Sequence, residues 1–145
     1  MRYEKVSAEF PAGEYYIGDL SYVMHDEWKE VCDLTIKGNN LINGAFNLSD
    51  GRRFFLAMTA YGDGEYQDNL GNTYGVDAGL LGIIATKDIS QEDQKNVTDG
   101  VVHDFYAPFS VIAESGIFDF GNVCIDTAWE PEDEDDEYFD PDEEY

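Results

Sequence analysis

Basic residues are scarce in this chain. Its 145 residues include 8 Lys and Arg and 2 His against 32 Asp and Glu, which gives a net charge of −24. A charge of this size repels nucleic-acid phosphates and anionic lipid headgroups, so direct binding to nucleic acid or to a membrane surface is excluded as a function. The partner that the composition favours is a basic protein surface.

Cysteines and long apolar runs are scarce as well. Two cysteines are too few for a disulfide scaffold, and the first residues of the sequence lack the basic and then apolar run that is typical of a secretory signal. Apolar stretches such as residues 54–60 and 78–85 are far shorter than the roughly 18 residues that a membrane span needs. We therefore expect a cytoplasmic protein without a membrane segment.

The carboxylates are concentrated toward the C-terminus. Residues 130–145 hold 11 of them and no base, which leaves 21 acids and 8 bases, a net of −13, for residues 1–129. Residues 130–145 contain few apolar groups, and repulsion between their like charges keeps such a segment extended. We predict one domain over residues 1–129 and a disordered acidic tail over residues 130–145.

This tail is the predicted partner-binding segment. An acidic arm is attracted to a basic surface at long range, and aromatic side chains within it can anchor it there. The alternative is a tail that only keeps the protein soluble. The predicted partner-binding residues are Glu132, Asp133, Glu134, Asp135, Asp136, Glu137, Tyr138, Phe139, Asp140 and Asp142.

Turn residues separate short apolar segments along residues 1–129. Asp63-Gly64, Gly71-Asn72 and Gly121-Asn122 are dipeptides that two-residue hairpin turns favour. Together with runs of β-branched and aromatic residues they predict a mainly β fold, either an antiparallel sandwich or a small barrel. The predicted strands cover residues 14–18, 45–48, 53–61, 65–70, 73–77, 80–85, 101–114, 117–120 and 122–127, with 53–61, 65–70 and 73–77 forming a meander.

One short helix is predicted among these strands. Trp28, Val31 and Cys32 fall at i, i+3 and i+4 and form one apolar stripe over residues 27–34, which should pack on a sheet. By contrast, residues 54–58 are consecutively apolar, which predicts a strand covered on both faces.

Two further positions interrupt the β pattern. Pro108 lies inside the predicted strand 101–114 and implies an edge or a bulge there. The S-x-x-D pattern that begins at Ser90 leaves a single helical turn and a loop equally open.

Motifs for metal binding and nucleophilic catalysis are missing. The two Cys and two His residues are scattered singly, and no P-loop or G-x-S-x-G pattern is present. Asp63, Glu65 and Asp68 are spaced loosely as in a calcium loop, but Gln67 replaces an acid there and a hairpin turn explains the segment better. No catalytic residue, metal or cofactor is therefore predicted.

A small enzyme or ligand-binding domain is the alternative function. Asp19 and His25 would pair as acid and base if the turn between them folds back, and Tyr22 would add a hydroxyl group. Asp63 and Asp77 lie in glycine-containing turns and complete this alternative ligand pocket. The competing interpretation is that these acids accept backbone hydrogen bonds in turns.

Two segments resemble a known kind of domain. AGEYYIGDLSYV at residues 12–23 and TAYGDGEYQDNLGNTYGVDAG at residues 59–79 resemble a small uncharacterised domain that recurs in proteins of bacteria and their viruses. The resemblance implies a compact β-rich fold and assigns no activity. The charge balance is also similar to that of viral DNA-mimic proteins, which occupy the DNA-binding surfaces of host restriction or defence enzymes.

The amount of charge suits such mimicry. A globular protein of 145 residues has a diameter of about 38 Å. A stretch of duplex DNA about 38 Å long carries about 22 phosphates. Residues 1–129 contain 21 carboxylates, which is a similar number. We predict an acidic, phage-encoded inhibitor in the host cytoplasm that occupies the basic surface of a host defence or nucleic-acid-binding protein. An acidic chaperone for a basic protein is a further alternative.

Overall fold

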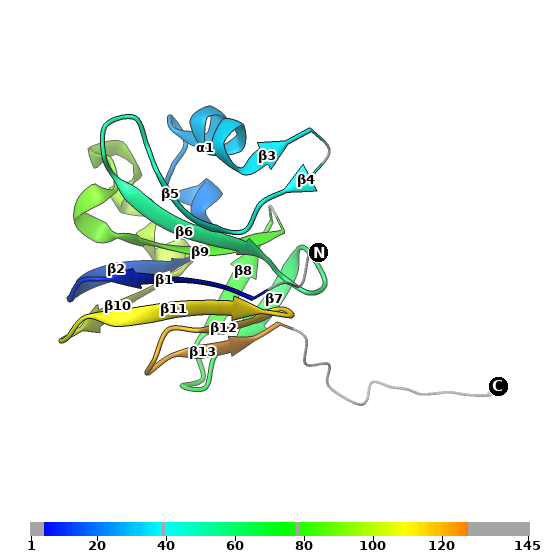
Figure 1. The fold of residues 1–145 in the computed structure, drawn as a ribbon. Helices are drawn as coiled ribbons and strands as arrows, with labels where there is room; N and C mark the ends of the chain where they lie inside the picture. Colours follow the sequence, from blue (N-terminus) through cyan, green and yellow to red (C-terminus); the bar gives the residue numbers. More distant parts are fainter. Residues whose placement is uncertain (1–4, 39, 78, 128–145) are drawn as a thin grey trace.

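The structure, a computed structural model, describes residues 5–38, 40–77 and 79–127 (Figure 1). Within these residues the protein is mainly β, and its strands pair antiparallel in two larger sheets and two hairpins. The predicted antiparallel sandwich is confirmed, and the described strands do not close into a barrel. The predicted tail, residues 130–145, lies outside the described residues.

The two larger sheets contain most of the strands. The five-stranded sheet has the order β10-β2-β9-β6-β5. Its strands are β2 (Gly13–Gly18), β5 (Gly44–Asn47), β6 (Arg53–Met58), β9 (Leu80–Ala85) and β10 (Val101–Phe105). The four-stranded sheet, in spatial order, consists of β1 (Val6–Phe10), β11 (Phe109–Glu114), β12 (Ile117–Asp119) and β13 (Cys124–Asp126). The two hairpins pair β3 (Ile36–Lys37) with β4 (Asn40–Leu41) and β7 (Gly64–Gln67) with β8 (Thr73–Val76).

Strand β6 is covered on both faces, as its unbroken apolar sequence predicts. Phe55 and Ala57 point into the core shared with the four-stranded sheet. Phe54 and Leu56 point to the opposite face, where they pack with a second core. Since successive side chains of a strand alternate between faces, both faces of β6 must be apolar.

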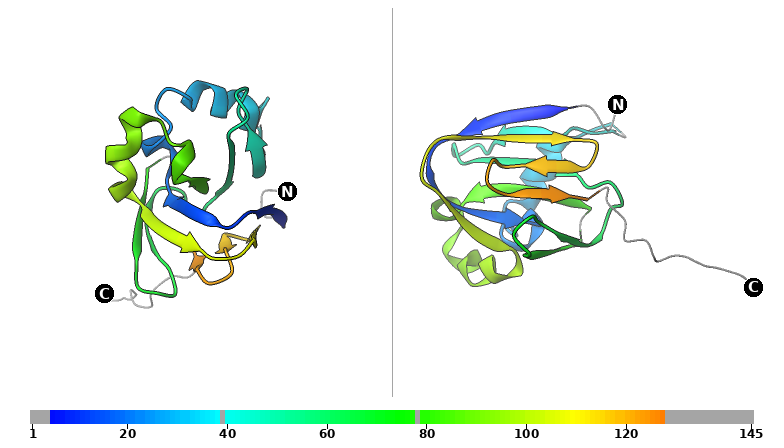
Figure 2. Two further views of the ribbon diagram at one scale, coloured as in Figure 1. Left: turned by 90° about the vertical axis from the view of Figure 1, so that its left-hand side faces the viewer. Right: turned by 90° about the horizontal axis from the view of Figure 1, so that it is seen from below.

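Helical segments complete the second core. They are η1 (Leu20–Tyr22), α1 (Trp28–Thr35), η2 (Thr86–Asp88) and η3 (Gln91–Asp99). The predicted helix over residues 27–34 is confirmed within one residue at each end, and its buried Val31 belongs to this core. Figure 2 shows these segments on the side of the molecule away from β12 and β13. The open choice after Ser90 resolves to the 3-10 segment η3.

Two chain segments bend from one sheet into the other and form one continuous ribbon. Strand β1 pairs with β11 as far as Phe10 and Phe109, and β2 pairs with β10 from Gly13 and Phe105. The Phe105 and Phe109 rings stack at this corner with their centroids 3.8 Å apart. The strand predicted over residues 101–114 is interrupted where Pro108 predicted it, at residues 106–108, but the two parts are strands of different sheets and do not form one strand with an edge or a bulge.

The predicted meander is wrong in one connection. Strand β6 pairs with β5 and β9, so Asp63-Gly64 does not close a hairpin between β6 and β7. Both edges of β6 are already occupied, and the chain leaves the sheet to form the separate β7–β8 hairpin. An isolated bridge between Asp68 and Ile125 joins this hairpin to strand β13. The hairpin predicted at Gly121-Asn122 is confirmed by the pairing of β12 and β13.

Candidate partner-binding surface

The charges divide the described residues into two regions. The base-free region, residues 59–77 and 99–127, contains 9 Asp and Glu and no Lys or Arg. The mixed region, residues 5–38, 40–58 and 79–98, contains 11 Asp and Glu and 7 Lys and Arg. The net charges from these side chains are thus −9 and −4, although the base-free region is the smaller one.

The base-free region is contiguous in space. Ladders join β11, β12 and β13, and the Asp68–Ile125 bridge joins β13 to β7. Tyr74 on β8 in turn contacts His103 on β10. The acids in this region that are exposed are Asp63, Glu65, Asp77, Asp99, Asp104, Glu114, Asp119 and Asp126.

Strand alternation explains why acids cover the outer face of the four-stranded sheet. Phe118 and Ile125 point inward and are fully buried in the shared core. Their neighbours Asp119 and Asp126, and Glu114 on β11, are exposed on the outer face. This face is turned toward the viewer in the right-hand view of Figure 2. The fold of the sheet thus requires these carboxylates to face outward.

Two bases of the mixed region, Arg52 and Lys29, pair with its own acids. Arg52 lies 2.7 Å from a carboxylate oxygen of Glu27 and also binds Asp50. Lys29 pairs with Asp33 one helical turn away, at 3.2 Å. These pairs neutralise charge locally, so the mixed region presents a weaker negative potential than the base-free region.

One acid of the base-free region is buried. Asp68 accepts hydrogen bonds from the backbone N–H groups of Leu70 and Asn72, at 2.8 and 2.9 Å, and from the Asn72 amide at 3.0 Å. The Tyr74 hydroxyl donates a fourth bond of 2.6 Å, and its oxygen lies 2.9 Å from His103 Nε2. Because the Tyr74 proton is directed at Asp68, His103 donates through Nε2 when its ring is neutral.

The pKa shifts in this cluster have clear causes. Burial alone would raise the pKa of Asp68, but the hydrogen bonds from Tyr74, Asn72 and Leu70 hold it below its ordinary value. Burial and the bond to Asp68 raise the pKa of the Tyr74 hydroxyl. Burial lowers the pKa of His103. The cluster therefore holds an ionised carboxylate beside two neutral rings.

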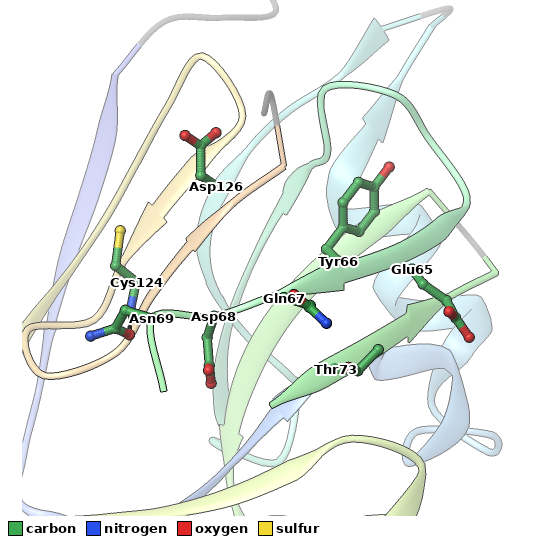
Figure 3. A pocket seen from close by; sticks show the side chains of 8 residues that line it. All are labelled: Glu65, Tyr66, Gln67, Asp68, Asn69, Thr73, Cys124 and Asp126. Atoms are coloured by element: carbon green, nitrogen blue, oxygen red, sulfur yellow. Dashed lines mark hydrogen bonds between the residues drawn. The ribbon is translucent and has the colours of Figure 1, made fainter. Parts of the chain in front are cut away.

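A pocket opens where the β7–β8 hairpin meets strand β13. It has a volume of about 680 Å³. Figure 3 shows its lining side chains, which come from β7, the loop after it, β8 and β13. They are Glu65, Tyr66, Gln67, Asp68, Asn69, Thr73, Cys124 and Asp126. Among the residues that the structure describes, no Lys or Arg lines this pocket, and its described lining belongs to the base-free region.

The structure brings together three of the five residues of the alternative ligand pocket. The Tyr22 hydroxyl donates to Asp77 Oδ2 at 2.6 Å, and the Asp77 backbone N–H donates to Asp19 Oδ2 at 2.7 Å. Asp19 is fully buried and also caps the turn through Ser21. The bond to Asp77 raises the pKa of the Tyr22 hydroxyl. These contacts tie η1 to the end of β8.

Of the other two residues, His25 has its acid partner elsewhere, and Asp63 follows the register of the β7–β8 hairpin to a position beside Asp77. His25 Nδ1 is 2.7 Å from Asp93 Oδ1, so the acid at its ring belongs to η3. Asp63 is exposed at the start of β7, one position beyond the Gly64–Val76 pair. Sequence reasoning noted Asp93 only as part of a capping pattern and missed both the Asp93–His25 contact and the Asp68–Tyr74–His103 cluster.

Comparisons of the chain with protein-family models, curated proteins and solved structures gave no match. In the part of the chain that the structure describes, no helix is both long and apolar enough to cross a membrane. Among the same residues, no group of three or more His, Cys, Asp and Glu side chains is placed to hold a metal ion. The predicted partner-binding residues 132–142 lie outside the described residues.

Proposed function

We propose that the protein is an acidic, phage-encoded inhibitor that occupies the basic surface of a host defence or nucleic-acid-binding protein in the host cytoplasm. The observation that carries this proposal is the base-free region, with its 8 exposed carboxylates and no Lys or Arg. A protein surface that binds phosphates meets there a negative potential, and the region itself contains no Lys or Arg to weaken it.

The placement of the charges supports this proposal beyond their number. Among the 20 described Asp and Glu residues, 14 are exposed, and the 4 buried ones lie at separate points of the fold. Carboxylates gathered inward around a cleft would have favoured a catalytic or metal-binding role. Outward display instead suits recognition of a cationic partner.

The C-terminal acidic segment would act on the same partner. Thr127, the last described residue, is buried, and its hydroxyl accepts a hydrogen bond of 2.9 Å from the Ala60 backbone N–H. Its backbone N–H donates to the Gly116 carbonyl at 2.9 Å. The chain therefore continues toward residues 132–142 from a fixed point within the base-free region.

Displacement from immobilised DNA tests the proposal. A bacterial lysate is bound to a duplex-DNA column at low salt, and the full chain is then applied. We expect it to release one or a few DNA-binding proteins at low salt, above the release by buffer alone. Because salt itself removes proteins from DNA, the salt dependence is measured on the complex of the full chain with a released protein, which should weaken steeply as charge attraction is screened. No release above buffer, or a complex whose affinity is independent of salt, would contradict the proposal.

Two variants with matched charge make this test specific. The triple variant Glu65→Gln/Asp104→Asn/Glu114→Gln removes 3 exposed charges from the base-free region. The control Asp26→Asn/Asp33→Asn/Glu92→Gln removes 3 exposed charges from the mixed region. We expect the first variant to need at least about tenfold more protein for the same release, and the control less than about twofold more. Equal losses would show that net charge alone matters.

A further inference from the structure

Ile117 on β12 is an exposed apolar side chain with carboxylates on three sides. Across the strands it lies opposite Glu114 on β11 and opposite Asp126 on β13. Along β12, Asp119 is the next residue on the same face, because side chains of a strand alternate and Phe118 points into the core. The Cβ atoms of directly opposed residues are about 5 Å apart. These carboxylates therefore form an acidic rim around Ile117.

A second apolar side chain extends this centre. Ile112 on β11 lies opposite Asp119, which places it diagonally from Ile117, about 7–8 Å away. Ile112 is partly exposed and Ile117 is 40% exposed. In the right-hand view of Figure 2, no other described segment lies across β11, β12 and β13. The isoleucine face, which consists of Ile112, Ile117, Glu114, Asp119 and Asp126, is thus accessible to a partner.

The charge of the isoleucine face limits what can cover it. Its five residues include three carboxylates and no base. A second copy of the chain placed face to face would bring carboxylates against carboxylates. The C-terminal segment over residues 130–145, with its 11 carboxylates, would meet the same repulsion. A partner whose apolar side chains are flanked by Lys or Arg instead complements both parts of the face.

The dimensions of the isoleucine face suit a helix. From β11 to β13 it spans two strand spacings, about 10 Å, which is close to the diameter of an α-helix with its side chains, about 10–12 Å. Residues three and four positions apart on a helix are neighbours at about 5–6 Å, a spacing similar to that of opposed residues in a sheet. An apolar stripe of a helix can therefore contact both isoleucines while its flanking bases reach the acidic rim.

We infer that the isoleucine face receives a basic amphipathic helix of the partner. The inference rests on the proposed function and specifies the face and the element of the partner that meet. The other carboxylates of the base-free region attract the partner at long range. The apolar contact at Ile112 and Ile117 then selects one position among those that charge alone would allow.

A titration of the full chain followed by NMR tests this inference. The probe is a capped peptide of about 18 residues of Ala, Leu and Lys, whose Leu residues recur at i, i+3, i+4 and i+7 between flanking Lys residues. The control peptide has the same composition and charge, but its Leu residues are spread around the helix. We expect saturable shifts in the amides of residues 110–114, 117–119 and 124–126, and at least about fivefold weaker binding of the control peptide.

A carboxylate placed at the centre of the face separates docking from attraction by charge. Ile117→Asp makes the chain more acidic, so charge attraction alone predicts tighter binding of the probe. Loss of the apolar contact predicts binding at least about fivefold weaker, which is the result we expect. The control Leu70→Asp adds the same charge at a leucine of the base-free region that is 61% exposed, and it should weaken binding by less than about twofold.

A milder variant keeps the strand intact. Ile117→Thr retains a β-branched side chain that suits a strand and should weaken binding of the probe a few fold. Unchanged amide shifts of Ile17 and Ile83, which are buried in the five-stranded sheet, establish that each variant is folded.

The outcomes separate this inference from the proposed function. Equal binding of the two peptides, tighter binding to Ile117→Asp, or shifts centred on another surface would overturn the docking of a helix here and leave charge-driven release from DNA intact. Shifts of the isoleucine face that depend on the concentration of the chain alone would assign the face to a second copy and overturn the inference. Binding of the probe as expected, with no release above buffer from the DNA column, would retain the face and overturn the proposed function.

Discussion

The mixed region and the base-free region each stabilise a buried carboxylate, but with different partners. Glu27 in the mixed region pairs with Arg52 at 2.7 Å, and its other oxygen is buried without a hydrogen-bond partner. Asp68 in the base-free region has four hydrogen bonds from neutral donors. Neutral donors satisfy a carboxylate without cancelling its charge. The base-free region can therefore bury an acid and remain free of Lys and Arg.

Breaking the Glu27–Arg52 pair should have the largest effect on stability. Arg52→Ala leaves Glu27, which is 9% exposed, without its cation. Loss of one partner of a buried pair costs about 3–5 kcal/mol of unfolding free energy, as urea denaturation would measure. The control Arg53→Ala removes a base that stacks on Phe10 and should cost about 1 kcal/mol. Similar losses in both variants would contradict the assigned role of Arg52.

Removing the charge of Asp68 should have the next largest effect. Asp68→Asn replaces an oxygen that accepts from Tyr74 and Asn72 with an amide that cannot accept. We expect a loss of about 2–3 kcal/mol in unfolding free energy, since bonds to charged groups are stronger than neutral ones. Asp126→Asn, in the same pocket but exposed, should change stability by less than about 0.5 kcal/mol. A mild effect of Asp68→Asn would show that the cluster is not structural.

The pH dependence of stability should also distinguish the two regions. Burial lowers the pKa of His103 from 6.5 in the folded protein. As the pH falls, the unfolded chain therefore binds a proton at His103 at a higher pH than the folded protein does. The contribution of His103 is present above pH 6.5 and is lost as the pH falls through its lower folded-state pKa. His103→Gln, which keeps a donor toward Tyr74, should remove this part of the pH dependence. Identical pH profiles for the two proteins would refute it.

A second loss of stability should follow at lower pH. Hydrogen bonds outweigh burial and hold the pKa values of Asp68 and Asp93 below 3.8. Their contributions are present above pH 3.8 and are lost as the pH falls below it. Denaturation curves of Asp68→Asn between pH 5 and 2 should show a smaller acid loss than those of the unchanged chain.

The smallest effect concerns repulsion between the surface charges. The triple variant Glu65→Gln/Asp104→Asn/Glu114→Gln should gain up to about 1 kcal/mol of stability at low salt, because it removes like charges from a region without cations. The triple variant Asp26→Asn/Asp33→Asn/Glu92→Gln should gain less, since Asp33 loses its pairing with Lys29. Added salt should reduce the difference. An equal gain in both variants would remove the electrostatic distinction between the regions.

Local patterns predicted the elements whose structure depends on neighbouring residues. The stripe of Trp28, Val31 and Cys32 found the helix, and the turn at Gly121-Asn122 found a hairpin. Sequence separation explains the failures. Strand β6 pairs with β5 and β9, and β9 begins at Leu80, 22 positions after the end of β6 at Met58. No local sequence pattern predicts that β9, and not the nearer β7, pairs with this edge of β6.

The sequence predicted only part of the candidate partner-binding surface. An excess of carboxylates was evident from composition, but their division into two regions depends on which strands become neighbours. Tyr74 and His103 are 29 positions apart, and the Asn69–Cys124 contact spans 55. Contacts of this range are set by the packing of the whole sheet, and no spacing rule identifies them.

The bent ribbon has a consequence for how the protein opens. Each of its two segments contributes one strand to each sheet, so neither sheet can separate without disturbing the stacked Phe105 and Phe109 rings. The amides of Val111 and Ile17, buried in different sheets, should then exchange with deuterium at rates governed by one shared opening. Because the two sheets open only together, the exposed carboxylates keep fixed positions relative to one another when a partner binds.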